Sequence, residues 1–303
     1  MEKPAHILIA TDLSSHAGKA ETRAAMLAQA LGAGKLVLMH VVPRLPLEAF
    51  TRILERTPLE TEQRLLDRAR AELEERADRL AGKYGIATGT AVRIGRPYVE
   101  IAEEAEALDA ELVVVGGYGA HLVRELFLGA TAEKVLRKSR RPVLVVKQEP
   151  LSPYKRLLVP VDFSPSSARA LDWAQAVAGG GELTVAHVYE APYESTLRYA
   201  SVEDKVLERY QAAARQQAQD AMRAFLEPRR AAGTGFLQRM LHGHPAAGIR
   251  ELAEEMRPDL IVMGKHGQTE LEELLLGSVT KHVLFETHCD MLVALDTAPS
   301  RGD

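Results

Sequence analysis

One short pattern occurs twice in the sequence, each time directly after a run of four apolar residues. The first copy reads Gly116-Gly117-Tyr118-Gly119, then nine residues, then Gly129-Ala130. The second reads Gly264-Lys265-His266-Gly267, then nine residues, then Gly277-Ser278. A short apolar run bounded by turn residues predicts a fully buried strand, and glycine allows the following backbone to adopt positive φ. We therefore expect the chain to leave a sheet through a glycine loop at both places.

Other landmarks repeat at nearly the same distance along the chain. Four pairs lie 147 to 150 residues apart: Asp12 and Asp162, His40 and His187, Gly95-Arg96-Pro97 and Gly243-His244-Pro245, and Gly116 and Gly264. A nearly constant offset indicates an internal duplication. At about 150 residues per domain, a chain of 303 residues is long enough for two domains. We predict domains at residues 1–147 and 155–298, joined by a linker at 148–154.

Within each half, apolar segments alternate with helical patterns. In the first half, strands are predicted at residues 6–11, 35–42, 88–94, 112–115 and 142–146. In the second half, they are predicted at 155–161, 260–263 and 290–295, and the long helix from about Ser201 is expected to end or kink at Pro228. Such alternation predicts an open parallel sheet with helices on both faces. The fold class is therefore α/β, with two tandem doubly wound domains.

The second glycine loop is expected to form part of a ligand site. In doubly wound sheets, ligands bind beyond the carboxyl ends of the strands, where the strand order reverses. A reversal between the first and fourth strands would bring Asp162 and this loop into one crevice. The helix that starts at Gly277-Ser278 offers unpaired amides and a hydroxyl to an anion, most naturally a phosphate.

Asp162 has two interpretations, as a helix cap or as a ligand-binding group. Ser164 followed by Pro165 is the better cap, because proline suits the first helical position. We therefore expect the Asp162 carboxylate to be available for a ribose or a base amine.

The residues Pro160-Val161-Asp162-Phe163-Ser164, His187-Val188, Gly243-x-Pro245 and Gly264-x2-Gly267-x9-Gly277-Ser278 resemble the motifs of the universal stress protein family. The match covers both halves. The resemblance implies five-stranded sheets of order 3-2-1-4-5 and an adenine-nucleotide site that is often loaded with ATP, with Mg²⁺ as an accompanying ion. It also implies that two paired domains in one chain take the place of a homodimer.

Carried over to this chain, the main site comprises Pro160, Val161, Asp162, Val188, Met263, Gly264, Gly267, Gly277, Ser278 and Val279. The resemblance implies that Asp162 contacts the ribose and that the backbone of Val161 and Val188 frames the adenine. The glycines, Ser278 and Val279 would hold the phosphates.

The first half departs from this pattern. Ala130 stands where the family motif has serine or threonine, and Tyr118 places a ring in the glycine loop, whereas Asp12, Val41, Gly116, Gly119 and Gly129 are intact. Loss of the hydroxyl removes a hydrogen bond to a charged group, worth about 1.5–3 kcal/mol or one to two decades of affinity. Thr131 points about 100° further round the helix and does not replace it. We predict ATP in the second half and weak binding, or a structural role, in the first.

Composition narrows the choice of partners. The net charge is -4 and the pI is near 6.2, so we expect no nucleic-acid partner. No apolar run reaches the roughly 18 to 20 residues that span a bilayer, and the chain begins directly with a predicted strand. The single cysteine, Cys289, fits a reducing compartment. These features predict a cytoplasmic protein with no membrane partner.

The function expected from these features is that of an adenine-nucleotide sensor in the stress response, in which ATP orders the loop between Gly267 and Gly277. Two alternatives stay open. One is an enzyme that slowly hydrolyses ATP or transfers a phosphoryl group, with His266 or Asp162 assisting. The other is a structural or interaction protein with vestigial pockets.

Several smaller features have alternative interpretations. His242 and His244 form a metal pair with His266 or His187, or are incidental loop histidines, and we favour the second interpretation. His40 and His187 are expected to be hydrogen-bonded core histidines. The last strands of the two halves, Val143–Val146 and Met291–Leu295, are candidates for the contact between the halves. Whether two chains form a homodimer stays open.

Overall fold

The structure is a computed structural model that describes residues 4–44, 58–117, 128–200, 202–231, 235–267 and 276–295. Its contacts divide the chain between Pro153 and Tyr154 into two compact units, called here the N-terminal and C-terminal halves. Gly119 and Tyr118 of the first glycine loop lie outside the described residues, as do residues 268–275 between Gly267 and Gly277.

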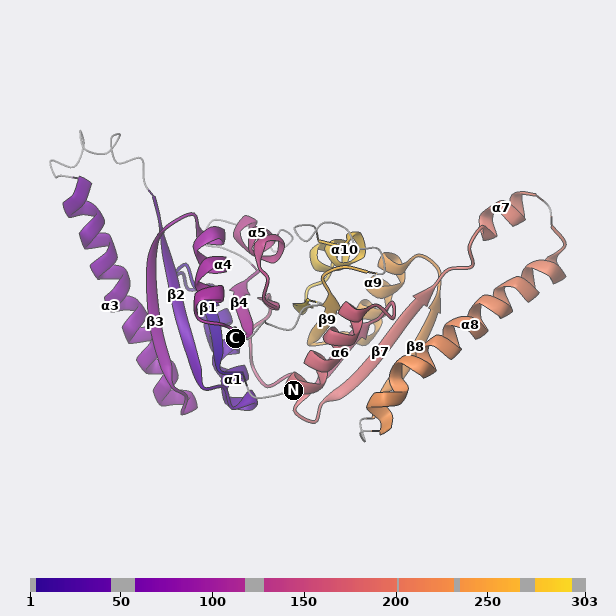
Figure 1. The fold of residues 1–303 in the computed structure, drawn as a ribbon, viewed down its shortest axis with the longest axis horizontal. Coiled ribbons are helices and arrows are strands. Elements are labelled where there is room, and N and C mark those ends of the chain that lie inside the picture. Colours follow the sequence, from indigo (N-terminus) through magenta and orange to yellow (C-terminus); the bar gives the residue numbers. More distant parts are fainter. Residues whose placement is uncertain are drawn as a thin grey trace. The chain divides into compact units, whose positions relative to one another are not determined.

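The N-terminal half is a five-stranded parallel sheet with the strand order β3-β2-β1-β4-β5. Its elements are β1 (His6–Ala10), α1 (Ala17–Leu31), β2 (Lys35–Pro43), α3 (Pro58–Tyr84), β3 (Thr88–Gly95), α4 (Pro97–Ala107), β4 (Leu112–Gly116), α5 (Ala130–Lys138) and β5 (Val143–Val146) (Figure 1). α1 packs against α3, and α4 packs against α5. Right-handed crossovers place these two pairs on opposite faces of the sheet.

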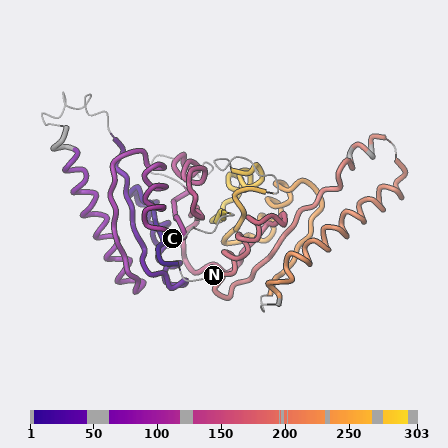
Figure 2. Tube along the Cα trace, viewed as in Figure 1, coloured from indigo at the N-terminus to yellow at the C-terminus, as the bar shows by residue number. Residues whose placement is uncertain are grey.

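The C-terminal half has the equivalent strand order, β8-β7-β6-β9-β10. Figure 2 traces the chain of both halves, coloured from indigo at the N-terminus to yellow at the C-terminus. Its elements are β6 (Arg156–Pro160), α6 (Pro165–Ala178), β7 (Glu182–Tyr189), α7 (Glu194–Tyr199), α8 (Asp204–Ala231), β8 (Leu237–His242), α9 (Pro245–Met256), β9 (Leu260–Gly264), α10 (Ser278–Glu286) and β10 (Asp290–Ala294). Each half thus has the order 3-2-1-4-5, and the order reverses between its first and fourth strands. The predicted fold class is confirmed.

Helix α8 differs from the sequence-based expectation because it continues past Pro228 to Ala231. A proline in the last turn removes one amide donor, which is a smaller loss than in the middle of a helix. The Arg229 guanidinium also holds this turn against α6, because it donates to Asp172 Oδ1 at 2.7 Å and to the carbonyl oxygen of Ala168 at 3.0 Å. Of the two outcomes expected at Pro228, an end or a kink, the helix therefore does not end there.

A carboxylate fixes the start of the first strand in both halves. Glu111, just before β4, accepts hydrogen bonds of 3.0 and 2.9 Å from the amides of Ala5 and His6 at the start of β1. Asp259, just before β9, accepts bonds of 2.8 and 3.0 Å from the corresponding two amides at the start of β6. The duplication therefore extends to a side-chain contact between distant parts of the chain.

The two long helices α3 and α8 can be aligned residue by residue through their buried positions. Both bury residues four positions apart: Ala69, Leu73 and Ala77 in α3, and Ala218, Met222 and Leu226 in α8. The offset of 149 residues agrees with that of the other landmarks. It places Phe225 of α8 at the position of Arg76 in α3.

Arg76 forms a polar network beneath α3. Its guanidinium donates to Glu21 Oε1 and Glu72 Oε1, each at 2.8 Å, and to the carbonyl oxygen of Leu13. The Thr11 hydroxyl donates to the same Glu21 oxygen at 2.5 Å. Burial alone would lower the pKa of Arg76, but the attraction and hydrogen bonds of Glu21 and Glu72 outweigh it and raise that pKa.

In the C-terminal half, the equivalent positions are apolar. Val161, Leu171 and Phe225 stand where the N-terminal half has Thr11, Glu21 and Arg76. The Phe225 ring lies 5.6 Å from the ring of Phe163, which stands at the position of Leu13. The turn between the first strand and the first helix is thus held in place by an ion pair in the N-terminal half and by aromatic packing in the C-terminal half.

Candidate functional site

A cavity of about 390 Å³ opens at the carboxyl ends of β6, β7 and β9, where the strand order reverses. It is lined by all ten residues predicted for the main site: Pro160, Val161, Asp162, Val188, Met263, Gly264, Gly267, Gly277, Ser278 and Val279. The volume lies within the range of roughly 300–1,000 Å³ that is usual for small-molecule sites. The structure brings these residues together, and their part in binding stays a prediction.

Asp162 is less available than the sequence suggested. Its Oδ1 accepts hydrogen bonds from the amide of Ser164 at 3.1 Å, from the Ser164 hydroxyl at 2.6 Å and from the Ser167 hydroxyl. Ser164 does cap α6, since its Oγ accepts from the Ser167 amide at 3.2 Å. The expectation that this cap leaves the whole Asp162 carboxylate for a ligand was wrong, because the turn at Phe163, with φ of 67°, brings both hydroxyls to one carboxylate oxygen.

Two glycines of the second loop stand where a side chain would meet neighbouring atoms. A Cβ on Gly264 would lie 2.1 Å from Ser166 Oγ and 2.9 Å from the carbonyl carbon of Ser166. A Cβ on Gly267 would lie 2.8 Å from Asp162 Oδ2. The glycines therefore allow the loop to approach the start of α6 and the Asp162 carboxylate closely.

Hydrogen bonds fix both ends of this loop. The Ser166 hydroxyl donates to the carbonyl oxygen of His266, and the Gly277 amide donates to the carbonyl oxygen of Lys265 at 2.9 Å. The Thr280 hydroxyl in the first turn of α10 donates to the carbonyl oxygen of Gly264 at 2.9 Å. The start of α10 is thereby held against the end of β9, and its first amides, which have no partner within the helix, lie at the cavity.

His187 lies at the edge of the cavity and is hydrogen-bonded, as expected. Its Nδ1 lies 2.7 Å from the carbonyl oxygen of Val161, and the Phe163 ring lies 4.3 Å from the imidazole. Because a carbonyl oxygen can only accept, Nδ1 carries the proton. Burial lowers the pKa of His187 and outweighs both this hydrogen bond and the attraction of Asp162. His40 makes the same contact, at 2.8 Å, to the carbonyl oxygen of Thr11.

The lowered pKa of His187 predicts a pH dependence of stability. Below its ordinary pKa of about 6.5, the histidine of the unfolded chain binds a proton that the folded chain excludes. The unfolded state then binds more protons, so stability should fall as the pH decreases from about 6.5 to the folded pKa, and the contribution should level off below it. Urea unfolding of wild type and His187→Asn at pH 7.5, 6.5 and about 5.5 measures this effect. Asparagine keeps a donor for Val161 and does not titrate, so equal slopes in both proteins would contradict the prediction.

The N-terminal half lacks the hydroxyls of this cavity. Alanine stands at the positions of Ser167, Ser278 and Thr280, namely at Ala17, Ala130 and Ala132, and Met39 stands at the position of Ala186. Ser167 and Thr280 were missed in the sequence analysis. Comparison of the two halves position by position would have found them.

The residues predicted for a weaker site in the N-terminal half have the expected places in the fold. Asp12 follows β1, is exposed and accepts a bond of 3.0 Å from the Ser14 amide. Val41 is buried in β2, Gly116 ends β4 and Gly129 caps α5. Gly119 lies outside the described residues, as do residues 120–127 of the same loop.

The histidine pair at the end of β8 has another contact. His242 Nε2 lies 2.8 Å from Glu194 Oε2 of α7. Within the ranges that the structure describes, no group of three or more His, Cys, Asp or Glu side chains is arranged to hold a metal ion. In the same part of the chain, no helix is long and apolar enough to cross a membrane.

The fold and this cavity together define a tandem doubly wound α/β protein with a cavity at the reversal of strand order in its C-terminal half. The model of the universal stress protein family matches residues 4–147 and again residues 153–294. The chain therefore belongs to the universal stress protein family and carries two copies of its domain, as predicted.

Similar proteins support this assignment. Universal stress protein MJ0531 of Methanocaldococcus jannaschii is 31% identical over 140 residues, which cover 46% of this chain and 81% of that protein. A universal stress protein of Thermus aquaticus is 33% identical over 142 residues, covering 46% and 98%. The crystal structure of a universal stress protein from Archaeoglobus fulgidus covers 96% of this chain and 98% of its own, with a TM-score of 0.67 and 23% identity. This last likeness supports the fold of both halves.

Proposed function

We propose that the C-terminal half binds ATP and that the chain responds to adenine nucleotide within the universal stress protein family. The proposal is carried by one observation. A cavity at the reversal of strand order is lined by a carboxylate, a glycine loop and three hydroxyls, and all three hydroxyls are replaced by alanine in the N-terminal half. Ser278 would bind phosphate directly, whereas Ser167 and Thr280 hold Asp162 and the start of α10 in place, so the proposed difference between the halves is one of nucleotide binding.

The proposal assigns a role to each part of the cavity. The first amides of α10 and the exposed Ser278 would hold the phosphates, because a helix N-terminus combines unpaired donors with a favourable dipole. Asp162, fixed through Oδ1 by its turn, would accept from the ribose, and the backbone of Val161 and Val188 would frame the adenine. Asp162 is the one carboxylate among the described residues that line the cavity, so Mg²⁺ would be held chiefly by phosphate oxygens.

The proposal extends to partners and location. Among the proposed partners, adenine nucleotide is the one that the cavity supports most directly. Pairing of the two halves through their last strands, association of two chains and a cytoplasmic location stay predictions. Slow ATP hydrolysis remains the alternative, because His266 lines the cavity beside the proposed phosphates. Steady release of ADP in the presence of Mg²⁺, lost in His266→Ala, would favour that alternative.

Calorimetric titration of the full chain with ATP tests the proposal. We expect one strong site per chain and an affinity about ten-fold lower in Ser278→Ala, because one hydrogen bond to a charged group is lost. Ala130→Ser is the matched variant, since it adds the hydroxyl at the equivalent position of the N-terminal half, and it should leave the strong site unchanged. Two equal sites in wild type, or unchanged affinity in Ser278→Ala, would contradict the assignment.

A further inference from the structure

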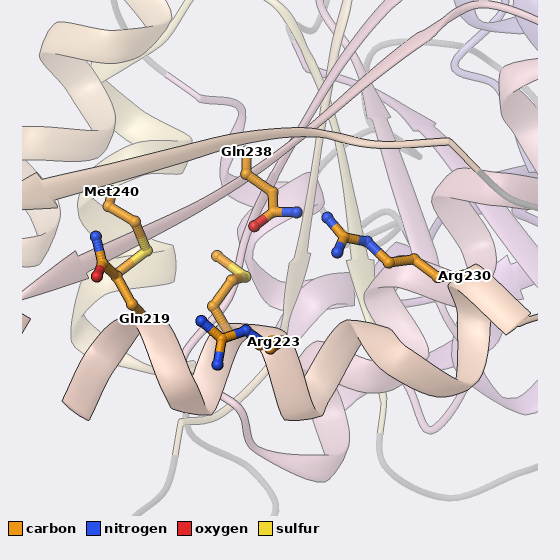
Figure 3. A pocket seen from close by; sticks show the side chains of 6 residues that line it. Gln219, Arg223, Arg230, Gln238 and Met240 are labelled. Atoms are coloured by element: carbon orange, nitrogen blue, oxygen red, sulfur yellow. The ribbon is translucent and has the colours of Figure 1, made fainter. Parts of the chain in front are cut away.

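A second hollow lies between helix α8 and the edge strand β8 (Figure 3). Its volume is about 330 Å³, and its lining shares no residue with the cavity described above. Four lining residues come from α8 and two from β8: Gln219, Met222, Arg223, Arg230, Gln238 and Met240.

The periodicity of the two elements explains why these side chains meet. Gln219, Arg223 and Arg230 are spaced by four and seven residues, which places them on one face of a helix. Gln238 and Met240 are two residues apart and so share one face of the strand. Figure 3 shows the side chains of Arg230 and Gln238 directed toward each other from α8 and β8.

The polar groups of the lining are donors to anions. Two guanidinium groups and two carboxamides line the hollow, and no carboxylate does so among the described residues. Arg230 makes no hydrogen bond or ion pair within the described part of the chain. Arg223 pairs with Asp220 at 3.0 Å, but both side chains are more than half exposed, so this pair is worth little. Both cations are therefore available, in a chain whose net charge is -4.

The hollow also has an apolar base. Met222 is 1% exposed and Met240 is half-buried. The rise of a helix, about 1.5 Å per residue, separates the Cα atoms of Arg223 and Arg230 by roughly 10 Å along the axis. An occupant with anionic groups at both arginines would need a carbon skeleton between them, and the half-buried Met240 offers an apolar surface to that skeleton.

The N-terminal half does not carry this arrangement. With the offset of 149 residues between α3 and α8, Glu74 and Ala81 stand at the positions of Arg223 and Arg230. Thr90 and Val92 stand at the positions of Gln238 and Met240. The two arginines are therefore not a requirement of the domain fold, since the duplicate domain forms the same helix and strand without them.

We propose that this hollow is a ligand site for a small organic polyanion. Its anionic groups bind Arg223 and Arg230, and its carbon skeleton rests on Met240. Phosphate and carboxylate groups both suit a guanidinium, which binds two of their oxygens at once. The class therefore includes sugar bisphosphates and tricarboxylates.

Calorimetric titration of the full chain at low ionic strength tests this proposal, with fructose 1,6-bisphosphate in one arm and citrate in the other. We expect saturable binding of at least one probe, weakened about ten-fold or more in both Arg223→Gln and Arg230→Gln. Arg215→Gln is the matched control, because Arg215 is exposed on the same helix and lies outside the lining. The affinity of this variant for the probe should differ from that of wild type by less than two-fold.

Three results would overturn the proposal. Absence of saturable binding of both probes would do so, as would an equal loss in Arg215→Gln and Arg230→Gln, which would indicate general attraction to α8. A loss in Ser278→Ala as large as that in Arg230→Gln would place the probe in the nucleotide cavity instead. Thermal unfolding of each variant checks that the exposed substitutions leave the fold intact.

Discussion

Replacement of Arg76 by leucine is expected to destabilise the N-terminal half by about 3–5 kcal/mol, because it leaves the buried carboxylate of Glu21 without its cation. Glu21 is 5% exposed and binds the Arg76 guanidinium at 2.8 Å. The same substitution also removes the hydrogen bonds that Arg76 donates to the carbonyl oxygen of Leu13 and to Glu72. Urea unfolding followed by circular dichroism should show an earlier transition for the N-terminal half, with the C-terminal transition unchanged.

Two further variants make this prediction specific. Arg79→Leu on the exposed side of α3 should cost less than about 0.5 kcal/mol, since Arg79 contributes only an exposed pair. The triple variant Thr11→Val, Glu21→Leu, Arg76→Phe copies the C-terminal half and should recover most of the loss, because neither the Glu21 carboxylate nor the Arg76 guanidinium is left without its partner. If Arg76→Leu and Arg79→Leu behave alike, the network contributes nothing measurable and our account of it is wrong.

Asp162→Ala is expected to lower the affinity for ATP about 100-fold. The substitution would remove the proposed bond to the ribose, worth roughly ten-fold or more. It also removes the acceptor of three hydrogen bonds that shape the turn between β6 and α6, so the remaining groups lose their positions. Calorimetric titration with ATP measures the loss, and thermal unfolding shows whether the C-terminal half still folds.

Asp12→Ala is the matched control for this experiment. Asp12 is the duplicate of Asp162, but it is exposed and lies in the half that lacks the three hydroxyls. Its removal should change the affinity of the strong site less than two-fold. If the two substitutions weaken ATP binding equally, the proposed difference between the halves cannot stand.

Much of the fold could be predicted from the sequence, because its signals are local and repeated. Apolar runs followed by glycines locate the strand ends, and the duplication confirms each element by a second copy. Parallel strands end at the same edge of a sheet, so the glycine loop and Asp162 had to meet once the strand order was known. This is why all ten predicted residues line one cavity.

Contacts between side chains of distant elements could not be predicted in this way. The sequence gives no local sign that Phe163 adopts positive φ, which directs two serine hydroxyls to Asp162. Nor does it show that Arg76 and Glu21, 55 residues apart, form an ion pair where the other half packs Phe225. Such contacts depend on how a helix is placed on the sheet, which packing decides.

The central place of β1 in its sheet has a consequence for synthesis on the ribosome. The carboxylate of Glu111, which fixes the start of β1, lies 105 residues further along the chain, and β4 follows it directly. At about 5–20 residues per second, translation of that stretch takes roughly 5–20 s. During that time one edge of β1 has no neighbouring strand to accept its hydrogen bonds. Because Asp259 lies 103 residues after Arg156, the fourth strand of the C-terminal half follows β6 after nearly the same delay, so one edge of a central strand is left unpaired twice during synthesis of each chain.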